Sequence, residues 1–225
     1  GELTFTPTAD ANGSATVTVS VSDDGGTANS GDNESPNATV TVTITPVNDE
    51  PSFTKGASPV VLEDSGISTN TGWATSISTG PSNESGQSVT FTLTNDNNSL
   101  FSSQPAISSL GVLTFTPASN ANGLATVIVS LSDNGGTANG GDDTYANQTF
   151  TITVTPVNDV PVINAISDPT AILEDAGSQT INLTGIGDGD ADVTQSLTVT
   201  ATSSNTSLIP NPTVTYTSDA ATGSL

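Results

Sequence analysis

The 225-residue sequence has no histidine, no cysteine and no methionine, and a single basic residue, Lys55, stands against 23 Asp and Glu residues. Without histidine and cysteine, the Ser-His-Asp and Cys-His nucleophile systems and the common zinc sites cannot be built. The formal net charge of -22 repels nucleic acid and anionic membrane surfaces, and it argues against both as partners. Oxygen-ligand chemistry remains, which is what hard cations such as calcium require.

Long hydrophobic runs are absent too. No apolar run approaches the roughly 20 residues that span a bilayer, so we expect no membrane insertion. The sequence has neither an initiator Met nor a signal peptide, and we expect it to be part of a longer chain. Low hydrophobicity with high net charge can indicate disorder, but only 11% of the residues are charged and the apolar residues are patterned. We therefore expect a folded protein.

Apolar and polar residues alternate in several short runs. Threonine or serine separates the apolar members, which are Val17, Val19 and Val21; Val40, Val42 and Ile44; Val89, Phe91 and Leu93; and Leu197 and Val199. A period of two with β-branched residues predicts half-buried strands whose apolar side faces inward. Turn signals separate the runs, namely Asn12-Gly13, Gly25-Gly26, Asn122-Gly123 and Gly135-Gly136. No segment has a sustained helical period, so the sequence predicts an all-β fold.

The sequence repeats itself with a period of about 110 residues. GELTFTPTADANGSATVTVSVSDDGGTANSGD at Gly1 returns as GVLTFTPASNANGLATVIVSLSDNGGTANGGD at Gly111. Three shorter segments also return: TPVNDEP at Thr45 as TPVNDVP at Thr155, VLEDSG at Val61 as ILEDAG at Ile172, and GVL at Gly111 as GSL at Gly223. A repeat of this length with short strands and frequent turns predicts one β-sandwich per repeat.

The two TPVND segments are the predicted linkers, and they divide the sequence unevenly. Residues 49–158 form one complete repeat, residues 1–48 hold the last three strands of one sandwich, and residues 159–225 hold the first four or so strands of another. An isolated half sandwich exposes its core and its unpaired strand edges. Two explanations stay open. We favour a window from a longer array, and the other is pairing of the two halves between neighbouring copies as a head-to-tail, open-ended filament.

Several segments resemble the cadherin repeat family. Residues 19–51, VSVSDDGGTANSGDNESPNATVTVTITPVNDEP, are similar to its last two strands and linker, and VLEDSG is similar to its early glutamate. Residues 185–202, GIGDGDADVTQSLTVTAT, are similar to its D-x-D segment followed by a strand. The PVNDxP linker most resembles bacterial cadherin-like tandem repeats of large cell-surface adhesins. The resemblance implies tandem Ig/cadherin-like Greek-key β-sandwiches of about 110 residues arranged as an elongated rod.

The resemblance also implies calcium at the junctions between repeats. At the junction near residue 158, the family pattern brings together Glu63, Asn158, Asp159, Asp188 and Asp190. Calcium takes about six to eight oxygen ligands and accepts carboxylate, amide and carbonyl oxygens. Four carboxylates in a small volume repel one another strongly unless a cation lies between them. A divalent ion there is expected to hold two sandwiches at a fixed angle.

The junction near residue 48 matches the family pattern less well. The residues that match are Asn48, Asp49 and Asp133. Gly80 and Ser82 stand where two ligand aspartates stand one repeat later, and Glu84 is a candidate replacement. Asp23 and Glu174 would serve junctions before and after this sequence. Proline replaces the first Asp of both linkers and the family's L-D-R-E segment is absent, so we expect fewer calcium ions per junction than in animal cadherins.

Ordinary structural roles stay open for the same residues. They are a turn cap at Asp23 and Asp133, a solvated acidic loop at Asp188, Asp190 and Asp192, a stiff linker turn at Asn48-Asp49, and a turn before a strand at Glu63-Asp64.

The leading functional prediction is a calcium-stiffened structural extender of an extracellular, cell-surface bacterial adhesin or fibre. Its partners are neighbouring repeats joined through calcium, with head-to-tail or lateral self-association as a further possibility. The alternative is a glycan- or ice-binding β-sandwich, with outward threonines such as Thr41 or the single tryptophan, Trp73, on the binding face. Exposed strand positions suit threonine, and alternation around Trp73 favours the core. We expect no enzyme, because the acids recur with the repeat and a single active site would not.

Overall fold

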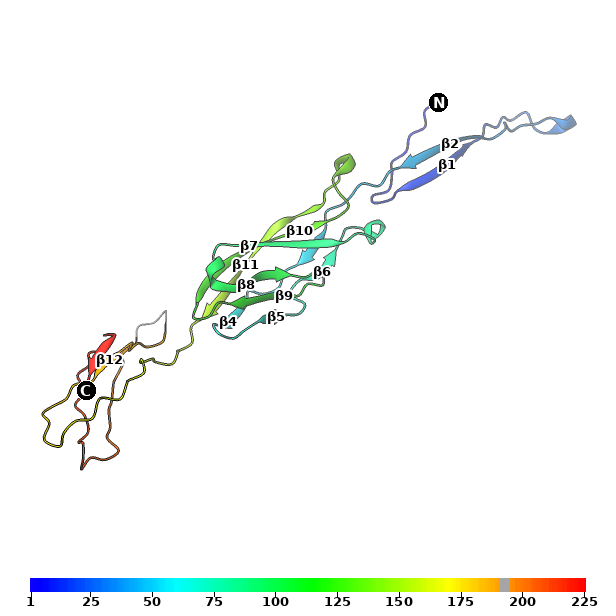
Figure 1. Ribbon diagram of the computed structural model, residues 1–225. Helices are drawn as coiled ribbons and strands as arrows, with labels where there is room; N and C mark the ends of the chain where they lie inside the picture. Colours follow the sequence, from blue (N-terminus) through cyan, green and yellow to red (C-terminus); the bar gives the residue numbers. More distant parts are fainter. Residues whose placement is uncertain (191–194) are drawn as a thin grey trace.

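The computed structural model describes residues 1–190 and 195–225 (Figure 1). Its regular elements are β-strands, and the helical segments among the described residues are short 3₁₀ turns. The predicted all-β fold is therefore confirmed. Within these ranges, no helix is both long enough and apolar enough to cross a membrane. Asp192, predicted to belong to an acidic loop, lies outside the described residues.

Most strands belong to a central unit between residues 52 and 155. Their bounds are β3 (Ser52–Thr54), β4 (Val60–Leu62), β5 (Ser68–Asn70), β6 (Thr75–Ser78), β7 (Val89–Asn95), β8 (Phe101–Ile107), β9 (Leu113–Pro117), β10 (Gly123–Asp133) and β11 (Thr144–Thr155). The 3₁₀ turns between them are η2 (Ser82–Glu84), η3 (Asn98–Leu100) and η4 (Ala138–Gly140).

These strands form two larger sheets. One has the order β4-β11-β10-β7 and the other the order β5-β9-β8, while β3 pairs with β6. The β4–β11 pair is parallel and the remaining pairs are antiparallel. Each sheet presents the apolar side of its alternating residues to the other, which gives a sandwich-like arrangement.

The hydrophobic core draws on both sheets. Its most buried apolar side chains include Leu113 and Phe115 of β9, Val127, Val129 and Leu131 of β10, and Ile152 and Val154 of β11. The rings of Trp73 and Phe150 lie 4.4 Å apart, and the Trp73 indole Nε1 donates a hydrogen bond of 2.8 Å to the Ala57 carbonyl oxygen. Trp73 is 6% exposed. Its predicted core position is confirmed, and it cannot serve as a surface platform for a sugar.

The N-terminal part contains a β-hairpin of β1 (Gly13–Val19) and β2 (Ala38–Ile44), with the 3₁₀ turn η1 (Ala28–Ser30) in its loop. Gly13 faces Ile44 in this hairpin, and Gly123 faces Val154 in the β10–β11 hairpin. Gly123 follows Gly13 by the same number of residues as Val154 follows Ile44, so the two hairpins have the same register. The repeat seen in the sequence is thus also a repeat of local structure at this hairpin.

The C-terminal part, from residue 159, has few strands. β12 (Asn182–Thr184) pairs with β13 (Thr222–Ser224), and isolated bridges join Val162 to Gly187 and Thr215 to Ser224. In Figure 1 it lies on the opposite side of the central unit from the β1–β2 hairpin.

One predicted strand does not form, and a further alternating segment forms none either. The segment LTFTP at residues 3–7 and the run of Leu197 and Val199 are outside any strand. Their counterparts in the central unit are β9, which pairs with β5 and β8, and β7, which pairs with β10. Outside the central unit, the counterparts of β5 and β8 lie in the C-terminal part, at the other end of the molecule from residues 3–7. The counterpart of β10 lies in the N-terminal part, at the other end from Leu197 and Val199 (Figure 1). An alternating sequence needs a neighbouring strand to satisfy its backbone hydrogen bonds, and neither segment has one among the described residues.

Two phenylalanines at equivalent positions of the repeat test whether the core is confined to the central unit. Phe115 is 1% exposed and Phe5 is 59% exposed. We expect Phe115→Ala to lower the free energy of unfolding by about 3–5 kcal/mol, because it leaves a cavity. Phe5→Ala should change it by less than about 0.5 kcal/mol. Urea unfolding followed by Trp73 fluorescence measures both, and equal losses would contradict this assignment.

Candidate metal sites at the two linkers

The first linker, residues 45–51, is attached to the central unit through Asn48. The Asn48 Nδ2 donates hydrogen bonds to Asp133 Oδ1 at 3.1 Å and to the Asp142 carbonyl oxygen at 2.6 Å. Asn48 Oδ1 accepts a hydrogen bond of 2.7 Å from Gln87 Nε2, and its backbone carbonyl accepts one of 3.0 Å from the Asp142 amide. A Cβ atom at Gly135 would overlap Asn48 Oδ1, so glycine is required for this approach.

Glu84 lies directly beneath this linker. Its side chain is 5% exposed, and Oε1 accepts a hydrogen bond of 2.9 Å from the Asp49 amide. Gly80 makes room for it, since a Cβ there would overlap Glu84 Oε2 and the backbone has a positive φ of 131°. Glu84 was predicted as a replacement ligand for this junction, and the structure does bring it to the linker.

The two carboxylate oxygens of Asp133 have different surroundings. Its Oδ1 accepts a hydrogen bond of 2.8 Å from the Gly135 amide, which confirms the predicted turn cap. Its Oδ2 is buried and accepts no hydrogen bond from the described residues, and the same holds for Glu84 Oε2 and Gln87 Oε1. Buried polar atoms without a partner are costly, and oxygen atoms of this kind are what calcium binds.

The backbone pairing shows which residues at the first junction correspond to Asp188 and Asp190 at the second. Ser52 faces Ser78, and Val162, the counterpart of Ser52 in the next repeat, faces Gly187. Gly187 is therefore the counterpart of Ser78, so Asp188 and Asp190 correspond to residues 79 and 81. The prediction that placed Gly80 and Ser82 at these positions is off by one residue. Residues 79 and 81 are threonine and proline, and the first junction still has no carboxylate at either position.

Glu63 lies under the second linker, residues 155–161. Its amide donates a hydrogen bond of 3.0 Å to the Thr155 carbonyl oxygen, and its Oε1 accepts one of 2.6 Å from the Val157 amide. The parallel pairing of β4 with β11 brings Glu63 to the end of β11, where the linker begins. Glu63 is 2% exposed and its Oε2 accepts no hydrogen bond from the described residues. Glu63 and Asp64 also form the predicted turn, although it comes directly after β4.

The loop of Asp188 and Asp190 lies beside the same linker. Val162 and Gly187 exchange backbone hydrogen bonds of 2.9 and 3.1 Å, and a Cβ at Gly189 would overlap the Val160 carbonyl oxygen. Both aspartates are half-buried, so this segment is not a fully solvated loop.

Gln195 binds both aspartates of this loop. Its amide donates to Asp188 Oδ2 at 3.0 Å, and its Nε2 donates to Asp190 Oδ2 at 2.8 Å. Sequence reasoning did not single out Gln195. The only signal was a long amide side chain shortly before an alternating run, and that pattern does not identify a partner.

The remaining predicted ligands have simpler surroundings. Asp159 is half-buried, and its Oδ2 is buried without a hydrogen bond from the described residues. Asn158 is exposed, and its Nδ2 donates to the Asp159 carbonyl oxygen at 2.9 Å. Asp23 is exposed and caps its turn through a 2.9 Å hydrogen bond from the Gly25 amide, while Glu174 is exposed.

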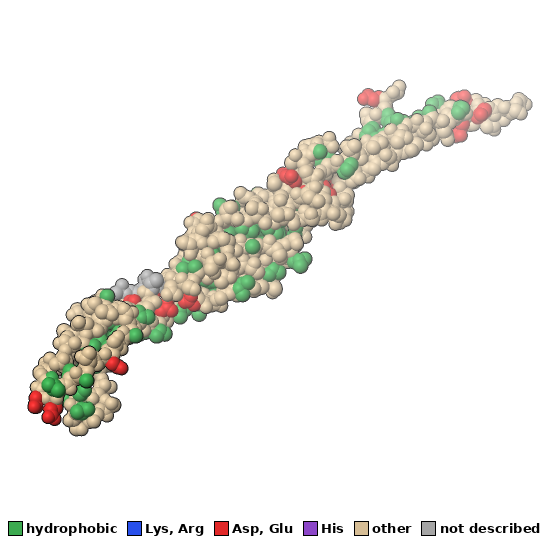
Figure 2. Space-filling view, viewed as in Figure 1, with side chains coloured by type: hydrophobic (Ala, Val, Ile, Leu, Met, Phe, Trp, Pro, Cys, Tyr) green, Lys and Arg blue, Asp and Glu red, His purple; other side chains and the backbone are tan. Residues whose placement is uncertain are grey.

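Hydrogen bonds connect Asn48 to Asp133 and the Asp49 amide to Glu84, and they join Asp188 and Asp190 through Gln195. Among the residues that the structure describes, no three acidic side chains form a group that could hold a metal ion. On the face shown in Figure 2, acidic side chains gather in small groups separated by uncharged surface. Four buried carboxylate oxygens nevertheless remain without a hydrogen bond from the described residues at the two linkers, those of Glu63, Glu84, Asp133 and Asp159.

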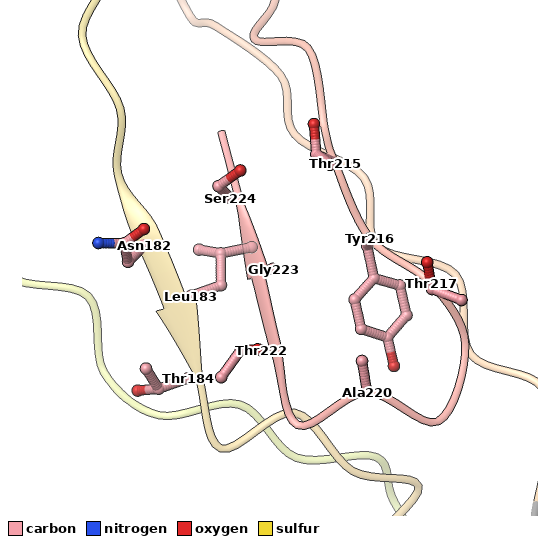
Figure 3. A pocket seen from close by; sticks show the side chains of 10 residues that line it. All are labelled: Asn182, Leu183, Thr184, Thr215, Tyr216, Thr217, Ala220, Thr222, Gly223 and Ser224. Carbon is pink, nitrogen blue, oxygen red and sulfur yellow. The ribbon is translucent and has the colours of Figure 1, made fainter.

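Two hollows lie elsewhere in the described part of the chain. One of about 550 Å³ lies between the β12–β13 pair and residues 215–217, and Figure 3 shows Leu183 and Tyr216 beside it. None of the described residues that line it is charged. A second hollow, of about 560 Å³, includes Glu50 and Asp142 and lies at the surface of β10 and β11.

The chain matches no protein-family model and no curated protein. The likeness to cadherin-like repeats therefore stays a prediction from the linker and the acidic motifs.

Two glycines test the close packing of Glu84 under the first linker. We expect Gly80→Ala to lower the free energy of unfolding by about 1–3 kcal/mol, because it displaces Glu84 and strains the backbone. Gly86→Ala is the control, since a Cβ there meets nothing within 4 Å. It should be neutral or slightly stabilising. Urea unfolding measures both, and equal effects would show that the Glu84 packing contributes nothing.

Proposed function

We propose that this chain is a calcium-stiffened structural extender, part of an extracellular bacterial adhesin or surface fibre. The observation that carries the proposal is the set of buried carboxylate oxygens at both linkers that accept no hydrogen bond from the described residues. Burying a carboxylate is unfavourable unless a hydrogen bond, a cation or another positive group compensates it. With one basic residue in 225, the chain has almost no positive side chains for this purpose.

The residues at the second linker suit a calcium ion best. Glu63 lies at the end of β4, and Asp159 belongs to the linker itself. A cation bound between them would tie the linker to the central unit. Asp188 and Asp190, beside the same linker, would extend this tie to the segment that follows. Calcium accepts such a mixture of carboxylate and carbonyl oxygens.

The first linker would hold a cation through fewer charged groups. Glu84 and Asp133 each have one buried oxygen there without a hydrogen bond from the described residues, and Gln87 Oε1 supplies a neutral one. Sites with few carboxylates bind calcium weakly, in a range that extracellular calcium still fills. An extracellular location would supply calcium at the concentration that such a site needs.

Stiffening follows from fixing the linkers. A flexible linker lets successive sandwiches adopt many relative orientations, whereas a bound cation restricts them to few. The result would be an elongated rod of repeats that holds a binding region away from the cell surface. The role is mechanical and not catalytic, because the acidic residues recur with the repeat and lie at linkers and turns.

Calcium binding and stiffening can be measured together. At free calcium about ten times Kd, one site adds about 1.4 kcal/mol of stability, or roughly 5–10 °C in Tm for a domain of about 100 residues. We expect calcium to raise Tm, and a chelator to lower it and to give a shorter, more variable particle in small-angle scattering.

Matched variants locate the effect. Glu63→Gln should reduce the calcium-dependent rise in Tm, and the double variant Glu63→Gln, Glu84→Gln should abolish it. Glu174→Gln, at the exposed glutamate of the equivalent ILEDAG segment, should leave the rise unchanged. If neither Tm nor particle length responds to chelation, the proposed function is wrong.

A further inference from the structure

The central unit holds a different part of the same motif at each of its two linkers. The segment TPVND begins at Thr45 in the first linker and at Thr155 in the second. In the first linker, the central unit binds Asn48 and Asp49. In the second linker, it binds Thr155 and Val157. Because the motif is identical at both places, the two linkers together show how its residues are divided between the unit before it and the unit after it.

The last two residues of the motif are fixed at the first linker. The Asn48 side chain donates two hydrogen bonds and accepts one, and its carbonyl oxygen accepts another from the Asp142 amide at 3.0 Å. The Asp49 amide donates to Glu84 Oε1 at 2.9 Å. Asn48 also packs against Gly141, where an added Cβ would lie 3.0 Å from the Asn48 Cβ. Asn48 and Asp49 therefore belong mechanically to the unit that follows them.

The residues before Asn48 lack this attachment. Thr45, Pro46 and Val47 are exposed, whereas Asn48 and Asp49 are half-buried. None of these three residues forms a hydrogen bond with the described residues of the central unit. The attachment of the first linker to the central unit thus begins at Asn48.

The first three residues of the motif are fixed at the second linker. The Thr155 carbonyl oxygen accepts a hydrogen bond of 3.0 Å from the Glu63 amide, and the Val157 amide donates one of 2.6 Å to Glu63 Oε1. Thr155 Oγ1 also donates to the Val61 carbonyl oxygen at 3.1 Å. Pro156 lies between the two residues that Glu63 binds. Its ring fixes φ and it has no N–H that needs a partner, so this short segment is stiff.

The attachment of the second linker ends after Val157. Asn158 is exposed, and its Nδ2 donates only to the neighbouring Asp159 carbonyl oxygen, at 2.9 Å. Residues 158–161 form no hydrogen bond with the described residues of the central unit. The boundary at this linker therefore lies between valine and asparagine, as it does at the first.

We propose that the TPVND motif is divided at its Val–Asn peptide bond, so that Thr, Pro and Val move with the preceding unit while Asn and Asp move with the following one. The central rigid unit then runs from Asn48 to Val157. A linker that is held on both sides has no free residue. Since the peptide bond itself is planar, the freedom that remains is rotation about the two single bonds beside it.

This division rests on the same linkers as the proposed function and deepens it. Glu63 lies before the Val157–Asn158 bond and Asp159 lies after it, and each has a buried oxygen that accepts no hydrogen bond from the described residues. A cation bound between these two oxygens would restrict the rotation that the hydrogen bonds leave free. The hydrogen bonds themselves need no cation, so the division can be tested in a chelator.

Backbone nitrogen relaxation measured by NMR on the full chain in chelator tests the division. The amides of Asp49 and Val157 should have order parameters of about 0.85, the value of rigid backbone, and those of Val47 and Asn158 should lie below about 0.6. Added calcium should then raise the order parameter of Asn158. If calcium leaves Asn158 mobile while Val157 is rigid in chelator, the proposed function is wrong and the division stands.

Variants in chelator test the residues that make the division. Glu63→Ala should lower the order parameter of Val157 to that of Asn158, whereas Glu63→Gln keeps an oxygen acceptor and should preserve it. Asn48→Ala should lower the order parameter of Asp49. Asn158→Ala is the matched control at the second linker and should change nothing, because the Asn158 side chain binds only its neighbour.

Insertion of one glycine locates the boundary independently. Between Val157 and Asn158 it leaves every hydrogen bond of the central unit in place, so Tm should not change. Between Pro156 and Val157 it moves the Val157 amide away from Glu63, and Tm should fall by about 5 °C or more. Equal effects of the two insertions, a mobile Val157 in chelator, or an Asn158 as rigid as Val157 in chelator would overturn the proposal.

Discussion

The structure depends on one constraint: the apolar face of a β-hairpin has to be covered for a sandwich to exist. The chain contains this hairpin twice in the same register. Around β10–β11 a complete set of partners excludes water from Val127 and Ile152, while around β1–β2 the corresponding Val17 and Val42 remain partly exposed. Strand formation elsewhere follows the same rule, because the segments of the repeat become strands only where their partners lie beside them.

The positions of the carboxylates are a consequence of this packing. Glu63 reaches the second linker because β4 pairs in parallel with the end of β11. Glu84 reaches the first linker because Gly80 leaves space for its carboxylate. Each linker therefore crosses over buried acidic groups that the central unit supplies. A cation at either place would join the packing of one unit to the orientation of the next, which is how local chemistry could set the stiffness of a long chain.

The sequence predicted the parts of the fold that local pattern controls. Alternation identified β1, β2 and β7, and the repeat marked the segments of β1 and β10 as equivalent. It failed for Leu197 and Val199, and residues 3–7 also form no strand, because strand formation at both places depends on partners that the sequence pattern does not place. Among the site residues, the acidic motifs predicted Glu63 and Asp133 beside the linkers. The contacts of Gln87 and Gln195 could not be predicted, because an amide side chain gains its partners only through tertiary packing.

Amide hydrogen exchange tests the covering constraint most directly. The two hairpins have the same register, so the amides that bond between their two strands can be compared at equivalent positions. Backbone amides of β10 and β11 should exchange at the rate of global unfolding. Equivalent amides of β1 and β2 should exchange about a thousandfold faster, a factor that corresponds to about 4 kcal/mol. Equal protection of the two hairpins would contradict the account.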